Sequence, residues 1–195
     1  MTEIPATRAS LLVRLRDRQD HDAWREFVRL YAPLVYRFAR RKGLQDADAA
    51  DLTQDVLRSV STSVGMFDPK VGLFRSWLFT LAHRRWYDFV QRSQRQTPSG
   101  HDQATIQFVA DELPAPDEEE SWNKEYERQL YTLAAEHVRP KVSEATWQAF
   151  QQTAVEGKSG QEVAAGLGIS VAAVYLAKSR VMVKLKAEVA RLKAE

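Results

Sequence analysis

The stretch from Lys158 to Glu195 constrains the fold most, because it has the pattern of two helices joined by a tight turn. Ser159 and Glu162 have the spacing of a capping box, in which the hydroxyl and the carboxylate each satisfy a backbone amide. Gly168 can adopt the left-handed conformation that ends a helix, and Ser170 can cap the next helix. This order is typical of a helix-turn-helix, whose second helix enters the major groove of DNA.

The second of these helices has an apolar stripe and an opposite polar face. The apolar residues recur at helical spacing: Val171, Val174, Val181, Leu185, Val189 and Leu192. The stripe predicts burial against the rest of a small domain. The polar face carries Tyr175, Ser179, Arg180 and Lys184, and it is the predicted DNA-facing side.

Composition excludes several classes of protein. A length of 195 residues suggests one or two small domains, and an apolar content of 44% is enough for real cores. No apolar run is long enough to span a bilayer, and residues 1–10 lack the apolar core of a signal peptide. The chain has no cysteine, which excludes disulfides and thiolate metal sites. These features predict a cytoplasmic protein that does not enter a membrane.

Charge is distributed unevenly, although the net charge is only +2. Residues 70–95 are rich in arginine, and the tail from Lys158 is net basic. Between these basic blocks, the charged residues of 101–120 are all acidic: Asp102, Asp111, Glu112, Asp117, Glu118, Glu119 and Glu120. Residues 96–120 contain three prolines and a glycine and sustain no helical period, so they are predicted to be an acidic flexible linker.

Hydrophobic periodicity predicts an all-α fold with two small helical domains, a helical bundle at 8–95 and a four-helix helix-turn-helix domain at 121–195. Before the last two helices, helices are expected at residues 8–17, 22–43, 46–62, 73–92, 121–138 and 143–155. The expected caps are Asp22, Asp46, Ser121 and Ser143. Pro33 predicts a kink or restart in the second helix.

An acidic face is expected near the start of the third helix. Asp48, Asp51 and Asp55 are spaced to lie on one side, beside the apolar Leu52 and Val56. On spacing alone this is a solvated face, which the helix dipole favours near an N-terminus.

Residues 66–92 interleave aromatic residues with arginines. Such a segment suits single-stranded nucleic acid, because rings stack on bases and guanidinium groups contact phosphates. The residues expected in the core are Phe74, Leu78, Leu81 and Phe89. Arg84, Tyr87 and Gln91 form a separate polar stripe, which is either a DNA surface or a solvated helix face.

In this order, the three features resemble the bacterial sigma-70 family, in its small two-domain extracytoplasmic-function (ECF) group. Residues 48–56 resemble the polymerase-docking helix, 67–92 the promoter-melting and −10 segment, and 159–180 the −35-reading helix-turn-helix. The resemblance extends from about Ser10 to Leu192. It implies a sigma factor that binds core RNA polymerase, recognises −35 and −10 promoter elements, and assists promoter melting.

The resemblance also assigns residues to three surfaces. Those that would face the β′ clamp helices of the polymerase are Asp48, Asp51, Gln54 and Asp55. Those that would contact the −10 element are Phe67, Asp68, Lys70, Arg84, Tyr87, Asp88 and Gln91, with the loop 67–71 holding a flipped base. Those that would contact the −35 element are Ala172, Tyr175, Ser179, Arg180 and Lys184.

Further partners are implied in the same way. The C-terminal domain would contact the polymerase β flap, the linker would occupy the RNA channel as a nucleic-acid mimic, and small sigma factors of this type are commonly held by an anti-sigma factor. The recognition helix departs from the family pattern, since Tyr175 replaces a common Lys or Arg and Ala173 lacks a hydroxyl. Tyr175 could contact a thymine methyl group or a phosphate, or could pack, which leaves the −35 preference open.

No catalytic or metal-binding pattern accompanies these motifs. The histidines lack the spacing of a metal-binding helix, and no glycine-rich phosphate loop is present. The sequence therefore predicts no enzyme, no cofactor and no metal, and it places His83 on the surface or facing DNA. Two alternatives stay open: a conventional helix-turn-helix regulator that binds DNA without polymerase, and an interaction module that sequesters another regulator.

Overall fold

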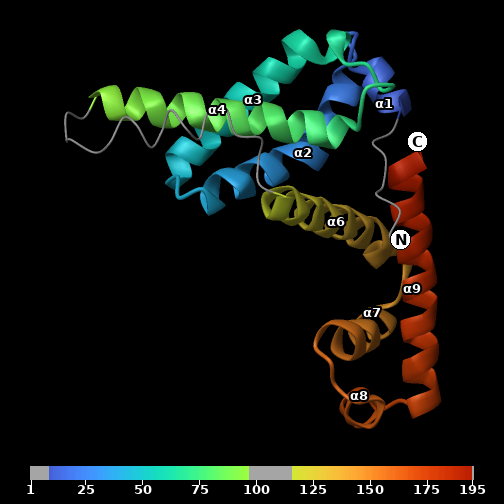
Figure 1. Cartoon of the computed structure of the whole chain (residues 1–195). Coiled ribbons are helices and arrows are strands. Elements are labelled where there is room, and N and C mark those ends of the chain that lie inside the picture. The colour runs from blue at the N-terminus through green and yellow to red at the C-terminus, as the bar shows by residue number, and fades with distance from the viewer. Residues whose placement is uncertain (1–8, 97–115, 195) are drawn as a thin grey trace. The chain divides into compact units, whose positions relative to one another are not determined.

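The computed structural model describes residues 9–96 and 116–194, which form helices and turns with no strand among them (Figure 1). The predicted all-α class is confirmed. The chain divides into two compact units, an N-terminal unit within residues 1–129 and a C-terminal unit within residues 130–194. This division falls after residue 121, where the sequence predicts that the second domain starts. Most of the predicted linker, residues 97–115, lies outside the described residues.

The N-terminal unit is built around three long helices. Its elements are α1 (Ala9–Arg14), α2 (His21–Arg41), α3 (Asp46–Ser63), the 3₁₀ turn η1 (Val64–Met66), α4 (Phe74–Gln96) and the part of α6 (Pro116–Val138) that ends at Gln129. Helix α3 packs against both α2 and α4. Leu52 and Val56 of α3, predicted as apolar residues beside the acidic face, are buried, and so is Val60 one turn later.

Aromatic rings fill much of this core. Phe27 and Tyr31 of α2 lie against Phe74 of α4, with ring centroids 6.0 and 5.7 Å away. Phe38 lies 5.8 Å from Phe79 and 5.9 Å from Trp122 of α6. Aromatic side chains are the largest apolar groups a helix can bury, so these contacts hold α2, α4 and the start of α6 together.

The starts of α2 and α3 differ from the prediction. Asp20 caps α2 by accepting from the Ala23 amide at 2.9 Å, and Arg14 donates to its carboxylate at 2.8 Å. The predicted cap Asp22 is therefore wrong, because the tertiary pair with Arg14 holds Asp20 in the capping position. Helix α3 is preceded by Gln45, which makes no side-chain cap.

Asp46 is the first residue of α3 rather than its cap. Its carboxylate accepts from the Tyr36 hydroxyl at 3.1 Å and lies 3.0 Å from Arg40. Helix α2 continues through Pro33, so the predicted restart is wrong. Burial of Leu34 and Val35 just after the proline offsets the backbone hydrogen bond that the proline removes.

Helix α6 begins at Pro116, so Ser121 lies inside the helix and does not cap it. Residues 116–120, predicted as linker, are helical. A proline suits the first helical position, and the acidic residues of the first turn, Asp117, Glu118 and Glu119, complement the helix dipole.

The C-terminal unit contains the helix-turn-helix. After the end of α6 come the 3₁₀ turn η2 (Arg139–Lys141), α7 (Glu144–Phe150), the π-helical turn η3 (Gln151–Val155), α8 (Gly160–Leu167) and α9 (Val171–Ala194). Ser143 caps α7, and Ser159 and Glu162 form the predicted capping box. Gly168 has a φ of 66°, and Ser170 accepts from the Ala173 amide at 3.1 Å. All four local predictions are confirmed.

The apolar stripe of α9 faces two clusters in this unit. Val181 and Leu185 pack with residues of α6 and α7, whereas Val174 packs with residues of α7 and α8. Val189 and Leu192 are partly buried, but Val171 is 37% exposed and was predicted wrongly as a buried residue. In the described part of the chain, only α8 and α9 taken together, bent by 103°, have the length and apolarity of a membrane span, and no single helix has both.

A buried carboxylate joins α9 to α6. Glu188 lies 2.7 Å from Nδ1 of His137 and accepts from Arg191 at 2.6 Å. The hydrogen bond from Arg191, followed by the one from His137, lowers the pKa of Glu188 to about 2.

The stability of the C-terminal unit is expected to depend on this carboxylate. Because its pKa is lowered on folding, its contribution is complete above about pH 4.5 and is lost as the pH falls toward about 2. Glu188→Gln should lower the melting temperature at neutral pH and flatten the acid limb of the stability profile. Thermal melts across acidic pH test this, with exposed Glu156→Gln as the control. Parallel profiles for both variants and the wild type would contradict it.

Candidate nucleic-acid interface

The acidic face of α3 adjoins its buried side. Asp51 and Gln54 are exposed, and Asp48 and Asp55 are half-buried. Within the described residues, no hydrogen bond or ion pair engages the side chain of Asp48 or Asp51. Asp55 differs, because it pairs with Arg58 at 2.6 Å and with Arg92 of α4 at 3.9 Å. The face therefore combines outward-facing acidic groups with one carboxylate that is tied to α4.

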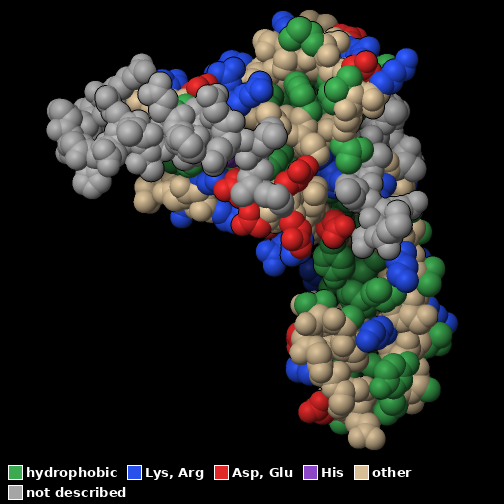
Figure 2. Space-filling view, viewed as in Figure 1, with side chains coloured by type: hydrophobic (Ala, Val, Ile, Leu, Met, Phe, Trp, Pro, Cys, Tyr) green, Lys and Arg blue, Asp and Glu red, His purple; other side chains and the backbone are tan. Residues whose placement is uncertain are grey.

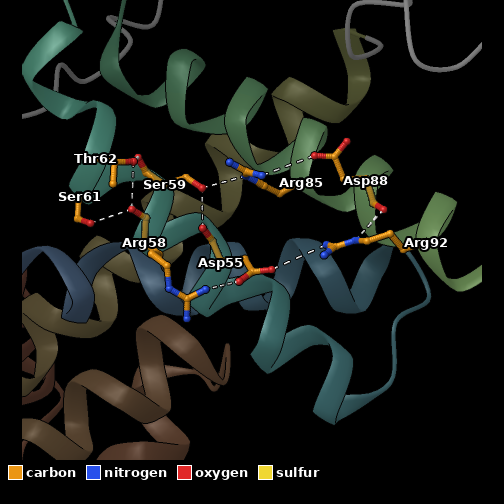
Figure 3. Close-up of polar contacts among 8 residues, drawn as sticks. All are labelled: Asp55, Arg58, Ser59, Ser61, Thr62, Arg85, Asp88 and Arg92. Atoms are coloured by element: carbon orange, nitrogen blue, oxygen red, sulfur yellow. Dashed lines mark hydrogen bonds and ion pairs between the residues drawn. The ribbon is translucent and has the colours of Figure 1, made fainter.

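A polar hollow of about 510 Å³ lies between α3 and α4 (Figure 3). Its lining residues are Asp55, Arg58, Ser59, Arg85, Tyr87, Asp88, Gln91 and Arg92. Arg85 Nε donates to Ser59 Oγ at 2.9 Å, and Arg85 lies 3.7 Å from Asp88. Arg92 Nε donates to the Asp88 carbonyl at 3.2 Å. The hollow thus joins a predicted docking residue to three predicted −10 residues.

Three arginines of this hollow, Arg58, Arg85 and Arg92, were not among the predicted site residues. The signal that could have found them was present, since Arg58 follows Asp55 at i+3 and the other two lie in the arginine-rich segment. Their role depends on the packing of α3 against α4, which the periodicity of each helix does not reveal.

The residues of the predicted polar stripe on α4 differ in exposure. Arg84 and Asp88 are exposed, whereas Tyr87 and Gln91 are half-buried, and Gln91 Nε2 donates to the Tyr87 hydroxyl. Of the four residues predicted to lie in the core, Phe74 and Leu78 are buried, whereas Leu81 and Phe89 are only half-buried.

The loop before α4 has a buried anchor and an exposed tip. Phe67 is 9% exposed, and its ring lies 5.4 Å from Phe74 and 5.6 Å from Trp77. The predicted DNA residue Phe67 is therefore part of the core in this structure. Asp68 and Lys70 are exposed, and the Lys70 amide donates to the Asp68 carboxylate at 2.9 Å. Val71, within the predicted loop 67–71, and Met66, at the end of η1, are both strongly exposed, and the sequence analysis gave neither an individual role.

His83 is buried, which contradicts its predicted surface position. Its ring lies 5.4 Å from Trp86 and 6.4 Å from Phe79. Burial, and then the nearby Lys42 ammonium, lower the pKa of His83, while Glu118 acts in the opposite direction. The neutral imidazole is favoured, and His83 serves the packing of α4.

The predicted −35 residues are all on the outer side of α9. Ala172, Tyr175, Ser179, Arg180 and Lys184 are exposed. Leu176, which was not predicted, is 51% exposed on the same turns. The first two turns of α9 therefore present mainly apolar groups, and the cationic residues follow them.

Tyr175 also packs against α8. A Cβ atom added to Gly160 would lie 2.9 Å from Cζ and from the hydroxyl oxygen of Tyr175, so only glycine leaves room for the ring as it stands. The ring is still 56% exposed. Packing and exposure, which were alternatives on sequence grounds, thus coexist in this residue.

Gly160→Ala is expected to displace the Tyr175 ring while keeping the unit folded. The new Cβ would contact a side chain that can rotate outward, and alanine favours the helix by up to about 1 kcal/mol relative to glycine. NMR shifts of the Tyr175 ring protons measure the displacement. Gly166→Ala in the same helix is the control, since its Cβ would meet nothing within 4 Å. Unchanged Tyr175 shifts in Gly160→Ala would contradict the contact.

Comparisons with known proteins agree with these features. Residues 27–96 match the Sigma-70 region 2 family. The ECF RNA polymerase sigma factor RpoE of Cereibacter sphaeroides is 24% identical over 176 residues, 90% of each chain. RNA polymerase sigma factor CnrH of Cupriavidus metallidurans is 29% identical over 170 residues, 85% of each chain.

Two further matches carry less weight, one because it covers only half of each chain and the other because its TM-score is low. The ECF RNA polymerase sigma factor SigK of Mycobacterium sp. (strain KMS) is 34% identical over 98 residues, 48% of this chain and 51% of that protein. A solved structure of CnrH in complex with the cytosolic domain of CnrY aligns at 23% identity over 91% of this chain and 94% of that chain, with a TM-score of 0.38.

The region 2 match spans most of α2 together with α3 and α4, and so includes the acidic face and the polar hollow. The two long alignments cover 90% and 85% of this chain. Residues 27–96 therefore match the Sigma-70 region 2 family, and over most of its length the chain is similar to RNA polymerase sigma factors, one of them of the extracytoplasmic-function group.

Proposed function

We propose that this chain is a sigma factor that binds core RNA polymerase, recognises −35 and −10 promoter elements and assists promoter melting. The observation that carries this function is the acidic face of α3 beside the arginine-lined hollow of α4, followed along the chain by a helix-turn-helix in a second unit. A polymerase contact and two DNA contacts can then be held on separate surfaces.

Polymerase docking is assigned to Asp48, Asp51, Gln54 and Asp55. The outward groups Asp51 and Gln54 can meet a basic partner directly, because the buried side of α3 fixes their direction. Asp55 contributes less freely, since contact with a partner would compete with Arg58 and Arg92. The β flap is the proposed contact of the C-terminal unit.

The −10 surface is assigned to the loop tip and the stripe on α4. Asp68 and Lys70 at the tip, and Arg84 and Tyr87 on the helix, offer charge and an aromatic ring to an unpaired strand. Asp88 and Gln91 complete the stripe beside the hollow. Phe67 is assigned an indirect role, in which its buried ring positions the loop that receives a flipped base.

The −35 surface is assigned to the outer side of α9. Arg180 and Lys184 suit phosphate or guanine contacts, whereas Ala172 and Tyr175 suit a thymine methyl group. Ser179 can bind either a base edge or a phosphate. The chain would carry out no chemistry itself, because the polymerase forms the bonds, and it would act in the cytoplasm.

Reconstitution with core polymerase tests this function. The protein should be retained by core polymerase in a pull-down and should direct run-off transcription from a promoter upstream of its own operon. Core polymerase alone is the control. Specific nanomolar binding to duplex DNA by the free protein, without any transcript from the reconstituted enzyme, would instead identify a conventional regulator.

A further inference from the structure

The start of α6 places acidic side chains on basic residues of the N-terminal unit. Figure 2 shows acidic side chains gathered over the first turns of α6, with basic side chains beside them. Glu118 pairs with Lys42 of α2 at 2.5 Å. Glu125 pairs with Arg37 and, at 3.4 Å, with Arg41. We call residues 117–129 of α6 the acidic cover.

The acidic cover is held by two buried aromatic residues. Trp122 is fully buried and lies 5.4 Å from Phe79 of α4. Tyr126 is 1% exposed and stacks on Tyr31 of α2 at 5.8 Å. Glu119 accepts from the Ser76 hydroxyl at 2.6 Å. The cover therefore has the apolar anchor and the polar contacts of a specific docking, rather than those of a loosely attached tail.

Arg75 is the buried cation of this docking whose hydrogen-bond donors are not satisfied among the described residues. It lies in the first turn of α4, is 1% exposed, and its guanidinium stacks over the Tyr126 ring at 4.4 Å. Among the described residues, none of its three guanidinium nitrogens has a hydrogen-bond partner. Leaving a buried charged group without such partners costs free energy, and the guanidinium fork matches a phosphate or carboxylate well.

The basic residues under the cover continue toward the proposed −10 surface. The ammonium of Lys42 lies 4.5 Å from the Trp86 ring centroid, and Trp86 adjoins Arg85 and Tyr87 of the polar hollow along α4. We call Arg37, Arg41, Lys42, Arg75 and Ser76 the covered surface. Four cations and a hydroxyl beside a DNA-binding stripe form a surface suited to consecutive phosphates.

We propose that the covered surface binds the phosphate backbone of DNA, and that the acidic cover occupies it as an internal competitor. Glu118, Glu119 and Glu125 take the places that phosphates would take, on the same donors. Displacement of the cover would expose Arg75 to an anion that can use its unpaired donors, and it would extend the −10 contact onto α2. The biological use of this role rests on the proposed sigma function. The DNA binding that defines it can be measured without polymerase.

The test compares two triple variants of the full chain with the same formal change in charge. The cover variant is Glu118→Gln, Glu119→Gln and Glu125→Gln, and the control variant is Asp117→Asn, Glu120→Gln and Asp22→Asn. Fluorescence anisotropy measures their binding to a labelled DNA duplex over a range of salt concentrations. The cover variant should bind about tenfold more tightly than the control. The slope of its log affinity against log salt concentration should also be steeper, by the amount that about two to three additional phosphate contacts produce.

A second pair of changes ties the gain to the covered surface. Arg37→Ala with Lys42→Ala, added to the cover variant, should cancel the gain in affinity and in salt slope. Arg18→Ala with Arg25→Ala, which removes two exposed cations elsewhere on the N-terminal unit, should leave most of the gain. Circular dichroism of each variant checks that the helices persist.

The outcomes separate this inference from its alternatives. Equal DNA binding by the cover and control variants would overturn it, as would a gain that survives Arg37→Ala with Lys42→Ala. Binding to labelled polyglutamate serves as a second measurement. If the cover variant binds polyglutamate more tightly than the control variant does, but binds DNA no more tightly, the inference is overturned in favour of an acidic protein partner. Because anisotropy needs no polymerase, failure of the wild type in run-off transcription would remove the sigma function and leave the cover intact. Normal transcription with the wild type, together with no gain in DNA binding by the cover variant, would keep the sigma function and overturn the role of the cover.

Discussion

Asp51→Lys is expected to weaken binding to core polymerase at least tenfold while the N-terminal unit stays folded. Asp51 is exposed, and no ion pair engages it within the described residues, so its loss removes no internal contact. Reversal places a cation against the basic partner that the docking assignment requires. A tenfold change corresponds to about 1.4 kcal/mol, which a like-charge contact readily supplies.

The measurement is a binding titration with core polymerase, followed by run-off transcription. Asp22→Lys is the control for charge, because Asp22 is an exposed first-turn carboxylate of α2 with the same change in charge, although it also breaks an exposed pair with Arg25 at 3.0 Å. If both variants bind polymerase as the wild type does, the docking assignment is wrong. If both lose binding equally, the effect comes from net charge and not from the face of α3.

Asp55→Lys is a less clean probe of the same face. It would break the pairs with Arg58 and Arg92 as well as any contact with polymerase. Its effect therefore mixes docking with the contact between α3 and α4, which is why Asp51 is the better choice.

Trp122→Ala is expected to destabilise the N-terminal unit by about 3–5 kcal/mol. Trp122 is fully buried between Phe38 and Phe79, so truncation removes the largest buried side chain of α6 and leaves a cavity. A loss of this size is a large fraction of the stability of a small domain. Equilibrium denaturation followed by circular dichroism measures it.

Trp122→Phe is the control for this change. The Trp122 indole nitrogen is buried and has no hydrogen-bond partner among the described residues. Phenylalanine keeps an aromatic ring and removes that unpaired donor, so its cost should be well below that of alanine. If Trp122→Ala unfolds as the wild type does, the start of α6 does not belong to the N-terminal core.

Local signals predicted most of the C-terminal unit. The capping box, the left-handed Gly168 and the Ser170 cap depend on residues within four positions of one another, so their chemistry is complete in the sequence. The same holds for the acidic face of α3, because helical spacing alone brings Asp48, Asp51 and Asp55 to one side.

Predictions failed where a distant residue decided the outcome. Asp20 replaces Asp22 as the cap because Arg14 holds it, and Phe67 is buried because Phe74 and Trp77 complete its pocket. These partners belong to neighbouring elements, so the periodicity of one helix contains no information about them.

The sequence by itself determined the all-α class, the helix-turn-helix and the three segments that resemble a sigma factor, because each depends on spacing within one helix or turn. Only the tertiary structure decided that residues 117–129 belong to the N-terminal unit and lie on Arg37, Lys42 and Arg75. In the sequence alone, the acidic run has the composition of a solvated linker. Burial of Trp122 and Tyr126 makes it a cover, since apolar contacts across the fold outweigh the local preference of the glutamates for water.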